Sequence, residues 1–359
     1  MKQNKKIKIS ILGFGRFGLL LTTILSSFSK YLDIKILDHK TIKNHKKHEK
    51  ELNIKFSNLK NICEDSDIII LAIPISQFKN ILKKISINLK NILKKDKNKK
   101  ILVIDVASVK VFSIKWMREI LPKEIEILWT HPMFWPVTTK FNYEKKEYFL
   151  KNHQIVLCSS RISEEKYKII KQFLQKLELK IIETSPENHD KQNAKTLSLV
   201  HFVGRGLIKS GVWPQEIYTP GYTDLLKILP HTTGDNEQLF FDMHNYNPYA
   251  KKIRQSFINS CEFLDERIDE NDLESKKNKL DFYRKFLDKY DEDIFKSFKK
   301  RLKIVKKIGN YKKKNNLKIF DKNREKSLIK KIIKKSKLDE NFVKKLYEII
   351  FDYSKKIQK

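Results

Sequence analysis

Two cations in the last seventy-six residues are spaced so that a helix would place them on one face. Arg301 and Lys312 are eleven residues apart. At about 100° per residue their directions around the helix axis differ by only about 20°, so both side chains would face one pocket. Arg284 stands seventeen residues before Arg301 and is turned away from it by about 100° in the same helix. Arg284 is therefore predicted to reach a neighbouring subunit.

Five further polar side chains in this segment share faces in the same way. Asp321, Arg324 and Glu325 have i, i+3 and i+4 spacing, and Ser354 and Gln358 have i and i+4 spacing. A solvated, basic helix face is the ordinary explanation for any one charged helix position. That explanation is much weaker for all eight residues taken together.

An apolar stripe predicts the first helix that would carry this cluster. Its members recur at steps of three and four residues, and they are Leu287, Tyr290, Ile294, Phe298, Leu302 and Val305. One helix cannot bury this stripe alone, so it is expected to be buried against partner helices. A second helix is predicted to start near Asp321, and a third to open with Asp339 as its N-cap.

The segments RLKIVKKIGNYKKKNNLKIFDKNREKSLI and LDENFVKKLYEIIFDYSKKIQ resemble the all-helical chorismate mutase family over about the last seventy-five residues. The resemblance implies a dimer in which Arg284 serves the other subunit's site. It also implies that Arg284, Arg301 and Arg324, with Ser354 nearby, bind the two carboxylates of chorismate. Lys312 and Gln358 would contact the ether oxygen of the breaking bond. Asp321 and Glu325 would hold the ring hydroxyl. A Claisen rearrangement needs no acid, base or nucleophile, and it gains from donors aimed where negative charge grows.

The other end of the chain carries a glycine-rich fingerprint in its proper context. An apolar strand, Ile7 to Leu12, runs into Gly13-Phe14-Gly15-Arg16-Phe17-Gly18 and then into a helical run. The first glycine permits the tight turn, the second lets the backbone approach a pyrophosphate, and the third allows close helix packing. Asp38 closes the next strand, where it can accept hydrogen bonds from ribose hydroxyls. NAD is favoured over NADP, although lysines after Asp38 leave room for a 2'-phosphate.

Strands and helices then alternate along the chain. Ile68 to Ile73, Ile101 to Val106 and Ile125 to Thr130 read as buried parallel strands, which predicts a Rossmann-type, doubly wound parallel sheet. Ligands collect at the carboxyl ends of such strands. Ser108 and His131 each follow one of them. By residue type alone, such a serine is usually a helix cap and such a histidine is usually structural.

The motifs DVASVK and HPMFWP, which contain Ser108 and His131, resemble those of the prephenate and arogenate dehydrogenases. The likeness continues through PENHDKQNAKTLSLVHFVGRGL, TPGYTDLLKIL and HTTGDNEQLFFDMHNYNP, and it spans about residues 7 to 260. It implies that His131 accepts a hydrogen bond from the substrate's C4 hydroxyl while hydride leaves C4. Ser108 would hold the same hydroxyl and orient His131. With an ordinary pKa of about 6.5, an imidazole is mostly a neutral acceptor at cellular pH.

The same resemblance extends to a helix that Ser185 and Pro186 are predicted to open. His201 matches the position that lines the substrate site. His189 and Asp190 match a motif whose role is open between packing and site support. In an ideal α-helix His189 and His201 diverge by about 120°, so they are not expected to share one ligand.

Three departures from the family pattern bear on the substrate. Trp135 stands where the family usually has glycine, and it would narrow the pocket or fill a gap. Lys227 replaces an arginine that holds a substrate carboxylate in many members, which predicts looser binding because lysine is a point charge. Asp235 resembles the plant arogenate-type pattern and could pair with an amino group. Arogenate is therefore an alternative to prephenate.

Composition is compatible with this interpretation. The 359 residues suffice for two or three domains. Although the net charge is +33, the basic residues are scattered and no nucleic-acid-binding motif is present, so small anionic substrates are expected and nucleic acid is not. The three cysteines, Cys63, Cys158 and Cys261, form neither a metal signature nor a disulfide framework, which fits a reducing cytoplasm. The longest apolar run is far short of the roughly twenty residues of a membrane span.

The expected organisation is a Rossmann NAD-binding domain over residues 1–158, a helical dimerisation and substrate domain over 159–270, and a three-helix chorismate mutase domain over 271–359. The acidic and polar run 265–279 is predicted to join the catalytic parts. Together the resemblances imply a cytoplasmic homodimer that converts chorismate to prephenate and then prephenate to 4-hydroxyphenylpyruvate. Two rivals are an arogenate dehydrogenase with the same mutase domain, and a basic binding protein whose Rossmann part only senses NAD.

Overall fold

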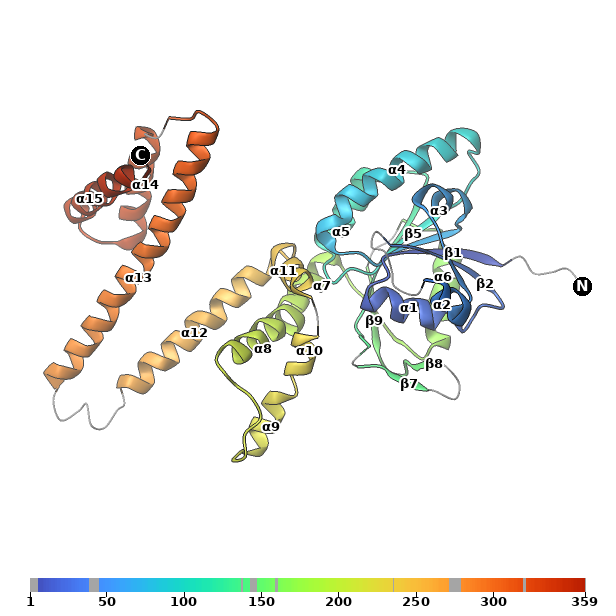
Figure 1. The fold of residues 1–359 in the computed structure, drawn as a ribbon, viewed down its shortest axis with the longest axis horizontal. Helices are drawn as coiled ribbons and strands as arrows, with labels where there is room; N and C mark the ends of the chain where they lie inside the picture. Colours follow the sequence, from blue (N-terminus) through green and yellow to red (C-terminus); the bar gives the residue numbers. More distant parts are fainter. Residues whose placement is uncertain are drawn as a thin grey trace, which may run out of the picture. The chain divides into compact units, whose positions relative to one another are not determined.

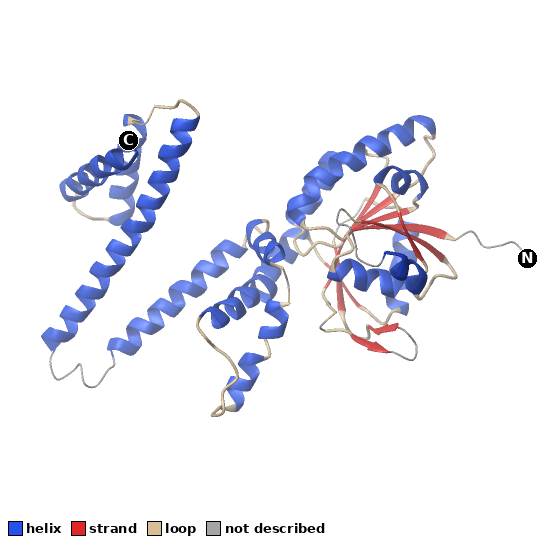
Figure 2. Ribbon diagram, viewed as in Figure 1, coloured by secondary structure: helices blue, strands red, loops and turns tan. Residues whose placement is uncertain are grey.

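The computed structural model describes residues 6–38, 45–136, 138–142, 147–158, 161–234, 236–270, 279–318 and 321–358. Over these residues the chain forms two compact units, Met1–Cys261 and Glu262–Lys359 (Figure 1). The first unit holds every strand of the described chain, and the second is helical (Figure 2). The division of the first unit near residue 158 stays a prediction.

An eight-stranded sheet forms the centre of the first unit, in the order β10-β9-β6-β5-β4-β1-β2-β3. Its strands are β1 (Ile7–Leu12), β2 (Leu32–Leu37), β3 (Ile54–Phe56), β4 (Ile68–Leu71), β5 (Leu102–Asp105), β6 (Glu126–Pro132), β9 (Gln154–Leu157) and β10 (Lys180–Glu183). All neighbours pair in parallel except β6 and β9, which are antiparallel. The predicted doubly wound parallel sheet is confirmed. The sequence interpretation did not include β3, β9 and β10, or a hairpin of β7 (Lys140–Asn142) and β8 (Glu147–Phe149), because three or four residues show no clear period.

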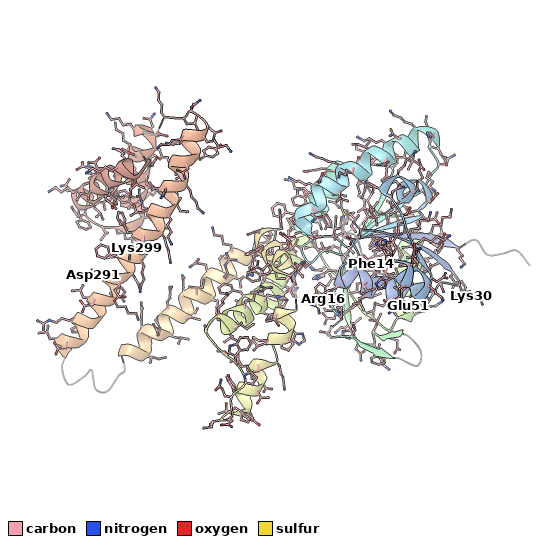
Figure 3. All side chains as sticks on the ribbon, viewed as in Figure 1. Phe14, Arg16, Lys30, Glu51, Asp291 and Lys299 are labelled. Atoms are coloured by element: carbon pink, nitrogen blue, oxygen red, sulfur yellow. The ribbon has the colours of Figure 1, made fainter. Side chains whose placement is uncertain are left out.

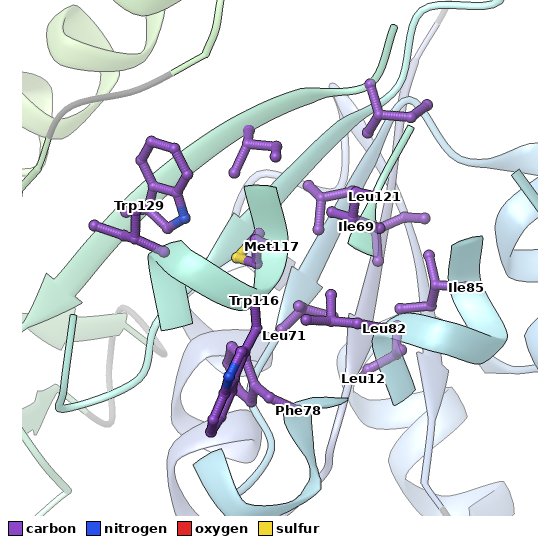
Figure 4. Packing of buried hydrophobic residues seen from close by; sticks show 14 of the residues in the cluster. Leu12, Ile69, Leu71, Phe78, Leu82, Ile85, Trp116, Met117, Leu121 and Trp129 are labelled. Atoms are coloured by element: carbon purple, nitrogen blue, oxygen red, sulfur yellow. The ribbon is translucent and has the colours of Figure 1, made fainter. Parts of the chain in front are cut away.

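Helices cover the sheet, and the residues of its central strands β4, β5 and β6 are mostly buried. The covering helices are α1 (Arg16–Ser26), α2 (His45–Leu52), α3 (Leu59–Asp65), the short η1 (Ile75–Gln77), α4 (Phe78–Lys95), α5 (Val111–Ile120) and α6 (Glu164–Lys176). Phe78, Leu82, Ile85 and Leu89 recur at helical spacing along α4 and are fully buried (Figure 4). Each such side chain contributes about 1.5–3 kcal/mol. This core holds the loops at the carboxyl ends of the strands in place.

The rest of the first unit is helical. Its elements are α7 (Pro186–Asn193), the π-helix η2 (Ala194–Ser198), α8 (Leu199–Lys209), α9 (Pro220–Leu226), α10 (Leu229–Thr233), α11 (Glu237–Asn245) and α12 (Ala250–Glu270), the last of which ends in the second unit. The N-cap prediction is confirmed, since the amide of Asn188 donates to Ser185 Oγ at 3.2 Å. The expected uninterrupted α-helix is wrong, because the π-turn changes the phase between His189 and His201. The predicted linker is also partly helical, since α12 continues to Glu270.

Besides the end of α12, the second unit contains α13 (Lys279–Lys314), α14 (Lys322–Ser336) and α15 (Glu340–Gln358), and these are the three predicted helices. The carboxylate of Asp339 accepts from the amide of Phe342 at 2.7 Å, which confirms the predicted N-cap of the third helix. Charged side chains project from α13, including Asp291 and Lys299 (Figure 3). Over the part of the chain that the structure describes, no helix is long and apolar enough to cross a membrane.

The predicted burial of the apolar stripe of the first helix against partner helices is confirmed within one chain only for its C-terminal half, and for its N-terminal half it stays a prediction. Leu287 is 61% exposed, Tyr290 48% and Ile294 62%. Val305, farther along α13, is buried, and so are Val343 and Phe351 on α15. The described helices of one chain therefore cover only the C-terminal half of the stripe.

Candidate active sites

The turn between β1 and α1, where Figure 3 labels Phe14 and Arg16, has an open position for an anionic group beside Gly15. Gly13 has a φ of +102°, and a Cβ there would lie 2.3 Å from the carbonyl oxygen of Ala72. A Cβ on Gly18 would lie 2.0 Å from the carbonyl oxygen of Gly13, whereas one on Gly15 would meet no atom within 4 Å. The fold itself thus requires the first and third glycines, and the second leaves space at the N-terminus of α1. These residues fit the pyrophosphate of a dinucleotide.

The other predicted cofactor residues surround this turn. Asp38 Oδ2 accepts from the amide of Phe14 at 2.6 Å, so the predicted ribose-binding carboxylate also holds the glycine-rich backbone. A Cβ on Gly234 would lie 2.9 Å from Arg16 Nη1, which places the Arg16 guanidinium beside the end of α10. The ring of Phe17 packs edge-to-face against the indole of Trp135, with 5.4 Å between the ring centroids. The indole that the sequence singled out therefore packs beside the dinucleotide turn.

The two glycines without a positive φ are expected to respond differently to the same change. Gly15→Ala should leave the free energy of unfolding nearly unchanged, because its Cβ meets open space, but raise the dinucleotide KM by on the order of tenfold or more. Gly18→Ala should destabilise the protein by about 1–3 kcal/mol, because its Cβ meets backbone. Chemical denaturation and cofactor titration of both variants check this. A strong loss of stability in Gly15→Ala would contradict the assignment of that space to the cofactor.

The turn between β5 and α5 is built on a buried ion pair. Lys110 Nζ lies 2.6 Å from Asp105 Oδ2, and both side chains are fully buried. Lys110 Nζ also donates to the carbonyl oxygen of Thr130 at 2.6 Å, and Ser113 Oγ donates to Asp105 Oδ2 at 2.7 Å. The pair thereby joins the carboxyl ends of β5 and β6. The sequence interpretation quoted DVASVK but assigned a role only to its serine, although an Asp and a Lys in a buried strand-end motif were a usable signal.

His131 lies at the end of β6, in contact with α7. Its Nδ1 is 2.9 Å from His189 Nε2, and His189 Nδ1 is 2.7 Å from Asp190 Oδ1. Burial, followed by the charges of His189 and Lys110, holds the pKa of His131 well below 6.5. His131 is therefore a neutral base at neutral pH. The sequence left open whether His189 and Asp190 serve packing or support the site. In the structure His189 is hydrogen-bonded to His131, and Asp190 is hydrogen-bonded to His189.

Ser108 is buried. The Nδ2 of Asn193, which lies 85 residues later in the chain, donates a hydrogen bond to the carbonyl oxygen of Ser108 at 2.5 Å. Among the described residues no hydrogen bond joins Ser108 to His131, and the residue hydrogen-bonded to the His131 ring is His189. Asn193 was not recognised in the sequence. Its Oδ1 is buried and has no partner among the described residues, so it remains able to accept a hydrogen bond.

A second set of histidines lies in the helical part. His201 is 2% exposed and His244 is 7% exposed. Arg254 Nη1 donates to His244 Nδ1 at 3.0 Å. Burial first, then Arg205 and His231, lowers the pKa of His201 to about 4. Burial first, then Arg254 and His201, lowers the pKa of His244 to about 4.

Stability is expected to fall with acid because of these two histidines. Their folded pKa values of about 4 lie below the ordinary 6.5, so between these values the unfolded chain binds more protons. The stability is complete above pH 6.5 and is lost as the pH falls toward 4. Each histidine should contribute about 2 kcal/mol of this loss between pH 7 and pH 5. Urea unfolding of wild type and His244→Gln, which keeps an acceptor for Arg254, checks it. An equal pH dependence in both proteins would contradict the assignment.

Of the two substrate residues predicted from the family pattern on either side of α10, the structure describes only Lys227. Lys227 is 71% exposed and pairs with Asp224 at 2.7 Å, so it is not positioned to bind a buried carboxylate in this state of the chain. Asp235 lies outside the described residues. One unrecognised link is Asp242, which is buried and accepts from the amide and hydroxyl of Ser76 at 3.2 and 2.9 Å. It joins α11 to η1.

In the second unit the structure brings part of the predicted cluster together. Arg301 Nη1 donates to Ser354 Oγ at 2.5 Å, and burial lowers the pKa of Arg301. A Cβ on Gly309 would lie 3.1 Å from the Cα and Cγ of Gln358, so this glycine lets α15 approach α13. Gln358 Oε1 is buried and has no hydrogen-bond partner among the described residues. Lys312 lies one turn beyond Gly309 and is half-buried.

The remaining residues of the cluster lie at the rim. Glu325 on α14 pairs with Lys355 at 3.6 Å. Asp321 is the N-cap of α14 and accepts from the amide of Arg324 at 3.0 Å, which confirms that the second helix starts near Asp321. Arg284 is 65% exposed and pairs only with Asp281 among the described contacts, at 3.3 Å. Among the described contacts, Arg284 is therefore not joined to Arg301 and Ser354 within one chain.

The described residues contain no group of three or more His, Cys, Asp or Glu side chains suited to a metal ion. The fold and the first site define a nucleotide-binding Rossmann domain with a buried, neutral imidazole at the carboxyl edge of its sheet. The second unit defines a helical bundle with a polar cluster between helices.

Comparison with protein families identifies both parts. The model "Prephenate dehydrogenase, nucleotide-binding domain" matches residues 30–183, and "Chorismate mutase type II" matches residues 283–359. A third model, "TYRAAT1-like, C-terminal domain", matches residues 207–280. The chain therefore joins a prephenate dehydrogenase nucleotide-binding domain to a type II chorismate mutase domain. Both resemblances drawn from the sequence are confirmed.

Curated relatives agree with this assignment. The chain is 29% identical over 252 residues to arogenate dehydrogenase 2 of Arabidopsis thaliana, covering 69% of this chain and 66% of the relative. It is 29% identical over 287 residues to a probable arogenate/prephenate dehydrogenase of Methanocaldococcus jannaschii, covering 76% of this chain and 59% of the relative. The chain thus spans about two thirds or less of the length of these relatives.

Solved structures share the fold. Synechocystis arogenate dehydrogenase has a TM-score of 0.51 at 20% identity, covering 81% of this chain and all of that chain. Prephenate dehydrogenase from A. aeolicus, in complex with hydroxyphenyl propionate and NAD+, has a TM-score of 0.56 at 19% identity, covering 82% of this chain and all of that chain. A nicotinamide dinucleotide is accordingly the cofactor class of the Rossmann domain.

Proposed function

We propose that the chain is a bifunctional enzyme of tyrosine biosynthesis. The helical bundle converts chorismate to prephenate, and the Rossmann unit oxidatively decarboxylates prephenate to 4-hydroxyphenylpyruvate with NAD. The observation that carries the second activity is the buried, neutral His131 at the carboxyl end of β6, on the sheet edge where the glycine-rich turn also lies. NAD is preferred in this proposal because Asp38 presents a carboxylate beside that turn.

In the dehydrogenase reaction His131 accepts the proton of the C4 hydroxyl as a general base. The nicotinamide supplies a hydride acceptor for C4. Loss of carbon dioxide then returns the electron pair of the broken bond to the ring, and the proton on His131 can return to the oxygen as the ring becomes aromatic. Because this base must be neutral, its lowered pKa keeps it ready at neutral pH. Ser108 and His201 are the proposed partners of the substrate's polar groups.

In the mutase reaction the side chains bind and orient the substrate without proton transfer. Arg301, held by Ser354, binds a carboxylate in a bidentate manner. Lys312 and Gln358 donate to the ether oxygen, on which negative charge grows as the C–O bond breaks. The exposed stripe of α13 and the exposed Arg284 support a homodimer in which each chain completes the other's site.

Arogenate is the second candidate substrate of the Rossmann unit. Its support is that two of the relatives above are named as arogenate or arogenate/prephenate dehydrogenases, and that Asp235 in the sequence resembles the plant arogenate-type pattern. Turnover with chorismate, prephenate and arogenate, each with NAD and with NADP, is the deciding experiment. If neither ring substrate reduces either nicotinamide, the dehydrogenase assignment is wrong. A chorismate rate no faster than the uncatalysed rearrangement would remove the mutase assignment.

A further inference from the structure

His131 is the first member of a buried chain of three side chains that the proposed reaction does not by itself require. His131 Nδ1 is 2.9 Å from His189 Nε2, and His189 Nδ1 is 2.7 Å from Asp190 Oδ1. The three residues are 4%, 5% and 0% exposed. Water therefore does not supply alternative partners, and the hydrogen positions along the chain depend on one another.

The charge of Asp190 determines the first hydrogen position. Asp190 Oδ1 accepts from the amide of Lys110 at 2.8 Å, and Oδ2 accepts from the amide of Val111 at 2.9 Å. These amides are at the N-terminus of α5, where the helix dipole favours an anion. An ionised carboxylate only accepts hydrogen bonds. His189 Nδ1 must therefore carry the hydrogen in its bond to Asp190.

The remaining hydrogen positions follow in order. A neutral His189 with its hydrogen on Nδ1 has a lone pair on Nε2. His131 Nδ1 must then donate to that lone pair, which leaves the lone pair of His131 on Nε2. The opposite arrangement would place a hydrogen on His131 Nε2 and turn the base into a donor.

We infer that His189 and Asp190 are positioning residues that hold His131 in the Nδ1–H tautomer, with Nε2 as the acceptor for the substrate hydroxyl. This inference rests on the proposed dehydrogenase function for its chemical purpose. When the hydroxyl proton moves to His131 Nε2, the Nδ1 proton stays in its bond to His189, and the new positive charge is two hydrogen bonds from Asp190. No second proton transfer is needed.

The backbone couples this chain to the strand that carries His131. The amide of Lys110 holds Asp190, and the Nζ of the same residue holds the carbonyl oxygen of Thr130, the neighbour of His131. The Asn247 side chain donates to the Asp190 carbonyl oxygen at 2.9 Å. Lys110 thus contacts both Asp190 and the backbone next to His131, which holds the two imidazole rings in place relative to each other.

The tautomer can be measured without any substrate. Protein labelled with 15N-histidine would give long-range 1H–15N spectra in which the nine histidines are assigned with His131→Asn and His189→Gln. The expected result is a protonated Nδ1 and an unprotonated Nε2 on both His131 and His189. A protonated Nε2 on His131 would overturn the inference whether or not the protein is a dehydrogenase.

Kinetics test what the tautomer does. His189→Gln keeps a carbonyl acceptor for His131 and an amide donor for Asp190, whereas His189→Leu keeps neither. The expected kcat falls less than tenfold in His189→Gln and on the order of 100-fold in His189→Leu, with a nearly unchanged dinucleotide KM. His153→Gln, which changes a histidine outside this chain, should match wild type.

The pH profile separates positioning from packing. The titratable and charged groups around His131 are His189 and Asp190 on α7, Lys110 before α5 and Asp105 on β5. Both His189→Gln and His189→Leu remove the charge of His189 that lowers the pKa of His131, and only His189→Leu also removes the acceptor of the Nδ1 proton, which disfavours the imidazolium. The acidic limb of kcat should therefore lie at lower pH in His189→Leu than in His189→Gln. Coincident limbs, with kcat of His189→Leu within about threefold of wild type, would overturn the inference. Absence of any turnover in wild type would instead refute the proposed function and leave the spectra to decide the tautomer.

Discussion

His131→Asn is expected to lower kcat of the nicotinamide-dependent reaction by on the order of 10³-fold while the chorismate mutase rate stays at its wild-type value. The imidazole is the only buried neutral base that the described structure places at the end of β6, and asparagine cannot take up a proton. Binding of the dinucleotide should change little, because the glycine-rich turn belongs to β1 and α1.

Steady-state rates with prephenate and arogenate, and the separate rate of chorismate loss, measure this separation. His153→Asn is the matched control, since it removes an imidazole outside the hydrogen-bonded chain. Retention of full dehydrogenase activity in His131→Asn would exclude His131 as the base. Loss of both activities would instead argue for one shared site.

The glycine-rich turn shows what local sequence can predict. Gly13 is required by its positive φ, and at both Gly13 and Gly18 a Cβ would meet a backbone carbonyl oxygen. Those oxygens belong to residues within about sixty positions of the turn. The strand before the turn and the helix after it have clear periods. For these reasons both the turn and the class of cofactor followed from the sequence.

The histidine site shows where such reasoning stops. His131 and His189 are 58 residues apart, and their contact depends on how α7 packs against the end of β6. No period in the sequence encodes that contact. The π-turn after α7 also changes the phase on which the angle between His189 and His201 was calculated. The sequence indicated which residues were of interest, but their connection required the fold.

The second unit likewise has features that the sequence predicted and features that it did not. Helical periodicity correctly predicted that Arg301 and Lys312 belong to one helix, α13. It did not predict that Arg301 reaches Ser354, 53 residues away, or that Asp321 is used as a helix cap. The burial of the N-terminal half of the stripe stays a prediction, because it depends on atoms that one chain does not supply.

Lys312→Ala is expected to lower mutase kcat by on the order of 10²–10³-fold, since it removes one donor aimed at the breaking bond, and to leave the dehydrogenase unchanged. Lys307→Ala, on the exposed side of the same helix, removes the same charge and should behave as wild type. Chorismate consumption by the three proteins measures the difference. Equal losses in both variants would attribute the effect to the overall +33 charge and not to the site.

Arg284→Ala should be as inactive as Lys312→Ala if each site takes Arg284 from the other chain, and a mixture of the two variants should then regain activity. In a mixed dimer, one site has both the intact lysine of its own chain and the intact arginine of its partner, while the other site lacks both. Random exchange of equal amounts makes half of the dimers mixed, so about a quarter of all sites, and of wild-type activity, should return. The exposure of Arg284 on the half of α13 whose apolar stripe is also exposed is the structural reason to expect this. A mixture no more active than its two components would show that each chain completes its own mutase site.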